Sequence, residues 1–457
     1  MRKQNKFLLL NSRVVKVIVL LISVGALARA ESAVEILPVD PVMIAPFIAL
    51  LLAIALGPLL NKHWWEKNYP AVSVTLSLIV VLYYIAIVHN ANRVVTTLHE
   101  YISFIALIGS LFVVSGGIQI RLKGKATPFI NVLLLGFGSF IANIVGTTGA
   151  SMLLIRPYIR TNRYHIKPYH IIFFIFLVSN VGGALTPIGD PPLFLGYLKG
   201  IPFFWIAQYM WMKWSLVVIA LLVIFYVIDS RDFRKRSIAV QKKIEEEGER
   251  AQFQGLQNLG FLLAILVAVF IENPIGVREL IMILASFGSY YTTNKKIHDY
   301  NDFNFAPIKE VAILFVGIFA TMMPALDWLT LNAQRLGMES VGQYYWATGI
   351  LSSFLDNAPT YLNFLTASFG LHHLNLENPQ HMQIFLSEHW WYVQAISIAA
   401  VFFGAMTYIG NGPNFMVKSI AEQNGIAMPS FGGYILRYSL PILLPLYIAI
   451  WFFFFHS

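Results

Sequence analysis

Long apolar stretches recur along the whole chain, and they restrict the fold more than any other feature. Roughly ten of them are long enough to cross a lipid bilayer, which takes about 20 helical residues. Hydrophobic residues make up 57% of the 457 residues and charged residues only 12%. A soluble protein with buried helices fits this pattern poorly. The sequence therefore predicts an all-α polytopic membrane protein.

The first 30 residues resemble a secretory signal peptide or an N-terminal signal-anchor. Basic residues at positions 2 and 3 precede an apolar run, and Ala28-Arg29-Ala30 fits a small-residue cleavage pattern. Either interpretation places residue 31 outside the cytoplasm. Lysines and arginines in cytoplasmic loops explain the net charge of +9, so no nucleic-acid partner is expected. The absence of cysteine excludes disulfides and cysteine metal sites.

One motif occurs twice in the chain. The sequence TPIGDPPLF at 186–194 returns as TYIGNGPNF at 407–415. Glycine and proline in apolar surroundings interrupt a helix and expose polar backbone at membrane depth. A duplicated, interrupted segment of this kind indicates the binding site of a secondary transporter. Aligned residues of the two copies include Thr186 with Thr407, Gly189 with Gly410, and Asp190 with Asn411.

Loop charges orient two other interrupted segments in opposite directions. Basic residues flank both ends of 127–155, so both ends should lie in the cytoplasm. The loop after 343–370 contains no lysine or arginine, so both ends of that segment should lie outside. Each segment is predicted to be a re-entrant hairpin. A polar tip at membrane depth is tolerated only where it lines a cavity or is buried in protein.

The chain is therefore predicted to contain two halves with inverted topology. The first half, 31–228, contains one hairpin and a broken helix at 169–198. The second half, 256–457, contains the other hairpin and a broken helix at 390–417. The charged stretch 229–255 is expected to be a cytoplasmic linker. Inverted repeats allow a transporter to alternate its access between two nearly equivalent conformations. The hairpin tips also match in sequence, with Asn143 aligned to Asn357.

Two acids are the strongest candidates for chemistry, Asp190 and Asp356. A carboxylate at membrane depth costs at least a few kcal/mol, so it indicates function by default. It can alternate between a proton and a transported metal cation such as sodium or lithium. The structural alternative is a hydrogen bond or helix cap, because Asp-Pro sequences favour turns. Asp327 lies near the predicted outer end of another span and is interpreted as solvated.

Neutral polar residues gather at the same four interruptions. Amide and hydroxyl oxygens suit hard cations such as sodium, while ordinary interhelical hydrogen bonding is the alternative role. No cofactor is expected, and the chain lacks a phosphate-binding loop and an HExxH motif, which argues against an ATP-driven pump and an enzyme. The candidate binding residues besides the two acids are Asn143, Thr147, Thr148, Asn180, Thr186, Gly189, Asn357, Thr360, Thr407, Gly410, Asn411 and Asn414.

The run SNVGGALTPIGDPP at 179–192 resembles the signature of the ion transporter superfamily. It is especially similar to NhaD-type sodium/proton antiporters and to the melanosomal P protein, and DNAPT at 356–360 resembles their hairpin tip. The resemblance implies a scaffold and a transport domain, elevator-type movement and a homodimer. The expected location is the bacterial inner membrane. The superfamily also includes citrate, dicarboxylate and arsenite carriers.

Two functions follow from these observations. The first is a sodium/proton antiporter in which Asp190 and Asp356 exchange protons for sodium. The second is a citrate-like organic-anion carrier coupled to sodium or protons. Two buried acids favour cation exchange, whereas an anion site should show basic groups or free helix N-termini. Dicarboxylate carriers typically have Ser-Asn-Thr tips, but tip one reads NIVGTT at 143–148 and tip two contains an acid.

Overall fold

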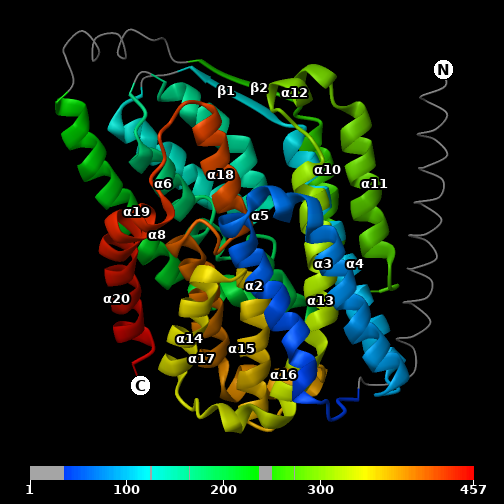
Figure 1. The fold of residues 1–457 in the computed structure, drawn as a ribbon. Helices are drawn as coiled ribbons and strands as arrows, with labels where there is room; N and C mark the ends of the chain where they lie inside the picture. The colour runs from blue at the N-terminus through cyan, green and yellow to red at the C-terminus, as the bar shows by residue number, and fades with distance from the viewer. Residues whose placement is uncertain (1–34, 124–125, 164, 236–249, 272, 457) are drawn as a thin grey trace, which may run out of the picture.

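The computed structural model describes residues 35–123, 126–163, 165–235, 250–271 and 273–456 (Figure 1). The predicted signal segment, 1–30, lies outside these residues. The helices and the first strand of the first half are α2 (Ala45–Leu60), α3 (Lys62–Ala86), α4 (Ala91–Gly116), β1 (Gln119–Lys123), α5 (Pro128–Thr161), α6 (Pro168–Leu177), α7 (Pro191–Leu198) and α8 (Phe203–Arg234).

The remaining elements follow the segment expected to link the two halves. They are β2 (Arg250–Gln254), α10 (Asn258–Val269), α11 (Val277–Thr292), α12 (Lys295–Tyr300), α13 (Ala306–Asn332), α14 (Val341–Phe354), α15 (Asn357–Leu371), α16 (Pro379–Glu388), α17 (Trp390–Phe403), α18 (Gly412–Gln423), α19 (Phe431–Tyr434) and α20 (Leu444–Phe454). A π-helical segment, Ile435–Leu443, joins α19 to α20.

The described residues contain seven helical segments that are long and apolar enough to span a membrane. Large apolar side chains on the outer helices are exposed, such as Leu60 at 81% and Phe453 at 73%. An apolar exterior of this kind suits lipid rather than water. In contrast, every residue of α6 from Tyr169 to Leu177 is buried. Helices α6 and α17 therefore lie inside the bundle, and the helices with exposed apolar faces lie outside them.

A small sheet is the one departure from the predicted all-helical fold among the described residues. Strands β1 and β2 pair antiparallel at the top of Figure 1, with Gln119 opposite Gln254 and Lys123 opposite Arg250. The expected linker, 229–255, includes the end of α8 and all of β2. The pairing of the two strands satisfies backbone N–H and C=O groups that no helix satisfies there.

Helix α5 folds back on itself at Gly146. This glycine has φ 77° and ψ 155°, a left-handed extended conformation that a side chain would strain. The side-chain amides of Asn131 and Asn162, at opposite ends of α5, exchange hydrogen bonds of 3.0 and 2.8 Å. A straight helix would hold residues 31 positions apart by about 46 Å. The two arms are therefore antiparallel, as expected for the first hairpin.

Helices α14 and α15 form the second hairpin, with Leu355 and Asp356 at its turn. Rings of Tyr344 and Phe364 from the two arms lie 6.3 Å apart. Two further interruptions separate α6 from α7 and α17 from α18. Each contains a short 3-10 turn and the first five residues of one copy of the repeated motif, 186–190 and 407–411.

Candidate functional site

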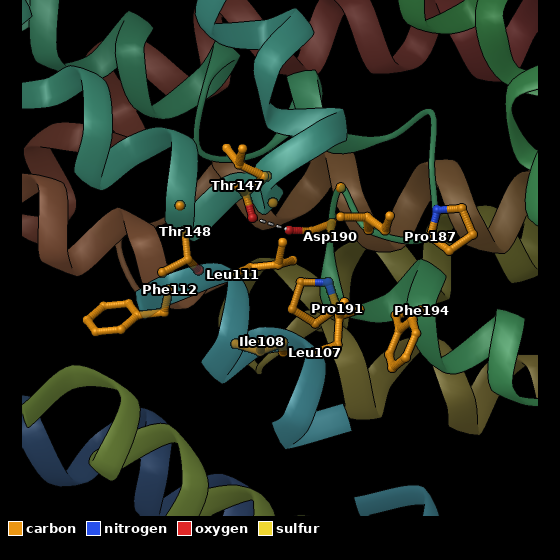
Figure 2. Close-up of a pocket in the computed structure, with 15 residues that line it drawn as sticks. Leu107, Ile108, Leu111, Phe112, Thr147, Thr148, Pro187, Asp190, Pro191 and Phe194 are labelled. Atoms are coloured by element: carbon orange, nitrogen blue, oxygen red, sulfur yellow. Dashed lines mark hydrogen bonds between the residues drawn. The ribbon is translucent and has the colours of Figure 1, made fainter. Parts of the chain in front are cut away.

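All four interruptions meet at the carboxylate of Asp190. Thr147, at the turn of α5, donates its hydroxyl to Oδ1 at 2.7 Å. Asn411, in the second broken helix, donates its amide to the same oxygen at 3.1 Å. Asn357, at the start of α15, has its Nδ2 2.5 Å from Oδ2. Asp190 is 1% exposed. Three donors from three separate elements thus hold one buried carboxylate. Figure 2 shows the first of these contacts, between Thr147 and Asp190.

The glycines of the repeated motif allow backbone segments to approach closely at the breaks. A Cβ on Gly189 would lie 2.0 Å from the carbonyl oxygen of Gly183. A Cβ on Gly410 would lie 2.7 Å from the carbonyl oxygen of Gly404. Thr147 N–H also donates to the Gly189 carbonyl at 2.8 Å. This packing fixes the start of α7, where Asp190 is the N-cap residue.

Three predicted asparagines form a second layer between the broken helices. Asn180 donates to the side chain of Asn414 at 2.7 Å. Asn411 also donates to the Ser179 carbonyl at 3.1 Å and lies 3.3 Å from Asn180 Oδ1. Asn414 donates to two carbonyls of its own broken helix. These contacts orient the Asn411 side chain, whose amide donates to Asp190.

Other predicted residues connect the hairpin tips to the broken helices and do not contact Asp190. Asn143 accepts from Leu185 N–H at 2.8 Å, and Thr186 donates to the Asn143 carbonyl at 2.6 Å. In the second half, Thr407 donates to the Ser353 carbonyl. Each motif threonine therefore bonds a carbonyl four residues before the hairpin residue that contacts Asp190.

These contacts change the alignment of the two tips. The sequence aligns Asn143 with Asn357, but the structure gives Asn357 the same role as Thr147. The shift is four residues, which is about one helical turn. Such a shift preserves the apolar face of a helix, so hydrophobic spacing alone could not detect it.

Asp356 is placed differently from Asp190. Its Oδ1 accepts the Ala358 backbone N–H at 3.0 Å, so it caps α15. Thr360 donates to the Asp356 carbonyl at 2.9 Å. Asp356 is partly exposed, and within the described residues no hydrogen bond joins it to Asp190. In this structure, Asp356 therefore makes the contacts of a helix cap, which was the structural alternative to a binding role.

A small cavity opens beside Asp190. It is lined by the turn of α5, the first motif and one face of α4, and it includes Thr148 (Figure 2). The cavity volume is about 30 Å³. A cavity must have a volume of at least about 10–15 Å³ to hold one water, so this one fits a small ion or one or two waters. No lysine, arginine or histidine is among its described lining residues.

The Asn357 side chain leaves one oxygen unpaired. Asn357 is 1% exposed, and its Oδ1 has no hydrogen-bond partner among the described residues. Buried acceptors almost always have a partner in proteins. An unpaired amide oxygen beside a carboxylate is therefore suited to receive a cation or a proton donor.

Three helices begin at the site, yet their N-termini are poorly equipped to bind an anion. Pro191 and Pro192 open α7 and have no N–H, and Leu193 N–H bonds the Asp190 carbonyl. In α18, Pro413 follows Gly412 and Asn414 N–H bonds the Asn411 carbonyl. Anion sites at helix N-termini depend on free N–H groups. Proline and local caps remove most of them here.

Sequence reasoning was wrong about Asp327. This residue is 1% exposed and accepts Arg93 at 3.0 Å and the Tyr84 hydroxyl at 2.6 Å. Its partners come from α3 and α4, more than 200 positions earlier in the chain. Arg93 lies near the start of α4, in a stretch that also contains His99 and Glu100, so no local pattern in the sequence indicated this pairing.

Comparison with known proteins places the chain in a family. Residues 37–455 match the family described as "Putative citrate transport". The chain belongs to this family. This family is part of the ion transporter superfamily, so the predicted resemblance to that superfamily is confirmed.

Two mycobacterial relatives match this transporter family member over a large part of their length. One is an uncharacterized transporter of Mycobacterium bovis and the other an uncharacterized transporter of Mycobacterium tuberculosis. Each is 24% identical over 322 residues, which cover 66% of this chain and 72% of the relative. With the apolar helices, these matches indicate a multi-pass membrane transporter.

Proposed function

We propose that the protein is a cation/proton antiporter of the inner membrane that exchanges sodium or lithium for protons. Asp190 is the exchange group, and it binds either a proton or the cation. Thr147, Asn357 and Asn411 contact its two oxygens and supply further ligands when their side chains turn. Asp356 lies one residue before Asn357 and adds a second negative charge near the tip of the second hairpin.

One observation carries this proposal. A buried carboxylate lines a cavity of about 30 Å³ with no basic residue among the described lining residues, and the Asn357 amide that donates to this carboxylate has an unpaired oxygen. Hard cations prefer carboxylate, amide and hydroxyl oxygens. An isolated buried charge is costly, so occupation by a cation or a proton stabilises this arrangement.

A citrate-like anion is the second candidate, because the matching family is described by citrate transport and three helix N-termini point to the site. Three features weigh against it. Prolines occupy N-terminal positions of these helices, a carboxylate stands at their centre, and the cavity is far smaller than the roughly 300 Å³ or more typical of organic-ligand pockets.

Alternating access fits the paired contacts of the two halves. Thr186 bonds the first hairpin as Thr407 bonds the second, and Gly189 packs on Gly183 as Gly410 packs on Gly404. These parallels support the proposed inverted repeat, in which the two hairpins open to opposite sides. We also propose, from the resemblance alone, elevator movement in a homodimer.

Transport by purified protein tests the proposal. Proteoliposomes with an internal pH dye are given sodium, lithium, potassium and citrate in turn. We expect sodium or lithium to move protons and citrate not to be taken up. Uptake of labelled citrate, with no proton movement by sodium or lithium at any pH, would replace the antiporter with the anion carrier.

The variant Asp190→Asn tests the exchange group itself. We expect it to fold and to lose exchange, because the amide cannot release a proton for a cation. The matched control is Asp299→Asn, since Asp299 is an exposed carboxylate in α12. Full exchange by Asp190→Asn, with the same pH profile as the wild type, would remove Asp190 from the proposed role.

A further inference from the structure

A buried ionic cluster lies away from the site, at the far end of the helix that Asp190 begins. Lys199 is the C-cap residue of α7 and donates to Glu100 at 2.7 Å and to Glu377 at 2.6 Å. Arg93 contacts the same Glu377 at 3.0 Å. The side chains of Lys199 and Arg93 are only 3% and 1% exposed.

The cluster joins two groups of elements. Arg93 and Glu100 lie on α4, and Asp327, which also binds Arg93, lies on α13. Lys199 directly follows α7, and Glu377 follows the second hairpin. Both α7 and α15 begin at the candidate site. The pairs Lys199–Glu100 and Arg93–Glu377 therefore each link α4 to a segment that starts at the site.

Helix α7 directly connects the candidate site to the ionic cluster. It has eight residues, so its ends are about 12 Å apart. Asp190 stands before its first residue and Lys199 after its last. Helix α4 also contacts both regions, since Leu107 and Leu111 line the cavity and Arg93 and Glu100 join the ionic cluster. A movement of α7 relative to α4 must therefore change both the cavity beside Asp190 and the contacts of the ionic cluster.

The chemistry of the cluster suits a reversible contact. Burying ion pairs costs desolvation, which offsets much of the attraction, so apolar side chains would hold these elements together at least as well. Ionic contacts instead require one geometry and regain hydration when they separate. Burial alone would raise the pKa of Glu377, but Lys199 and Arg93 hold it below its ordinary value, so Glu377 stays ionised at neutral pH.

We infer that Arg93, Glu100, Lys199 and Glu377 form a latch that holds α7 and the second hairpin against α4 in one conformation of the transport cycle. Release of the latch allows these site-bearing segments to move relative to α4. This inference rests on the proposed alternating-access function. It assigns a role to charged residues that do not bind the transported ion.

Distance measurements between spin labels test the latch directly. The chain has no cysteine, so Ala91→Cys on α4 and Gln380→Cys on α16 provide two unique labelling positions, both exposed. We expect Glu100→Gln with Glu377→Gln to raise the ratio of a second distance population to the main one about tenfold, which corresponds to a lost interaction of about 1.4 kcal/mol. Lys199→Arg should keep the original distribution.

The matched control is Glu66→Gln, which removes an exposed carboxylate from an ion pair within α3. It should leave the distances unchanged. If the double variant is not monodisperse, Glu100→Gln alone decides the question by the same measurement. An unchanged distance distribution in a folded latch variant would overturn the latch. Absence of sodium/proton exchange by the wild type would instead overturn the proposed function, independently of the distances.

Discussion

At the scale of single residues, the environment of Asp190 decides what the site can bind. A threonine hydroxyl and two asparagine amides satisfy its oxygens, and each of these groups also carries an oxygen that can face a cation. The groups that contact Asp190 are therefore uncharged, and they can present either a hydrogen-bond donor or an oxygen. A fixed basic partner would instead neutralise the acid permanently and prevent exchange.

Thr147→Val tests this view because it keeps the shape of the side chain and removes its hydroxyl. Hydrogen bonds to charged groups contribute about 1.5–3 kcal/mol. We therefore expect the sodium concentration for half-maximal exchange to rise roughly 10- to 100-fold. Thr147→Ser, which keeps the hydroxyl, should stay near the wild type. Initial rates across a sodium series measure both, and an unchanged half-maximal concentration in Thr147→Val would show that the hydroxyl has no part in binding.

Sequence reasoning found most residues near Asp190 because they occur at helix interruptions. The repeated motif paired Asp190 with Asn411, and the structure shows these two side chains in contact. It could not separate Thr147, which contacts Asp190, from Asn143, which holds the tip. Both are polar and lie one turn apart, so only the path of the folded chain distinguishes them.

At the scale of elements, the breaks in the helices depend on close backbone packing. Each half has a motif glycine that lies against another backbone segment, and these contacts position the starts of α7 and α18. The sequence predicted the breaks well, because glycine and proline interrupt helices through local chemistry. It did not predict strands β1 and β2, whose pairing joins segments more than 120 positions apart.

Gly189→Ala should disrupt this packing. The new methyl group would lie 2.0 Å from a backbone oxygen of Gly183, which cannot move aside like a flexible side chain. We expect a loss of at least about 2 kcal/mol of stability, within the range for overpacked cores, and loss of exchange. Thermal unfolding in detergent measures the effect. Gly412→Ala is the control, because no atom lies within 4 Å of its added methyl group. Equal melting temperatures of the two variants would contradict the packing argument.

At the scale of the whole molecule, charge acts in two separate places. In the candidate site, Asp190 has no basic residue among the described residues that line its cavity, whereas the proposed latch pairs each basic group with an acid. The sequence suggested the first arrangement from acids in apolar segments. It could not suggest the second, because Arg93, Lys199 and Glu377 are far apart in the chain and meet only when α4, α7 and the second hairpin pack together.

The proposed inverted arrangement of the two halves makes a final prediction about sidedness. The first hairpin should open to the cytoplasm and the second to the outside, because basic residues flank only the first. Arg163 lies just after α5, and Ser387 lies near the end of α16, after the second hairpin; both residues are exposed. Each is replaced by cysteine in a separate variant. In spheroplasts, an impermeant maleimide should label Ser387→Cys at once and Arg163→Cys only after permeabilisation. The cysteine-free wild type provides the background. Labelling of both positions from the same side would exclude hairpins that open in opposite directions, and with them the proposed use of two equivalent halves for alternating access.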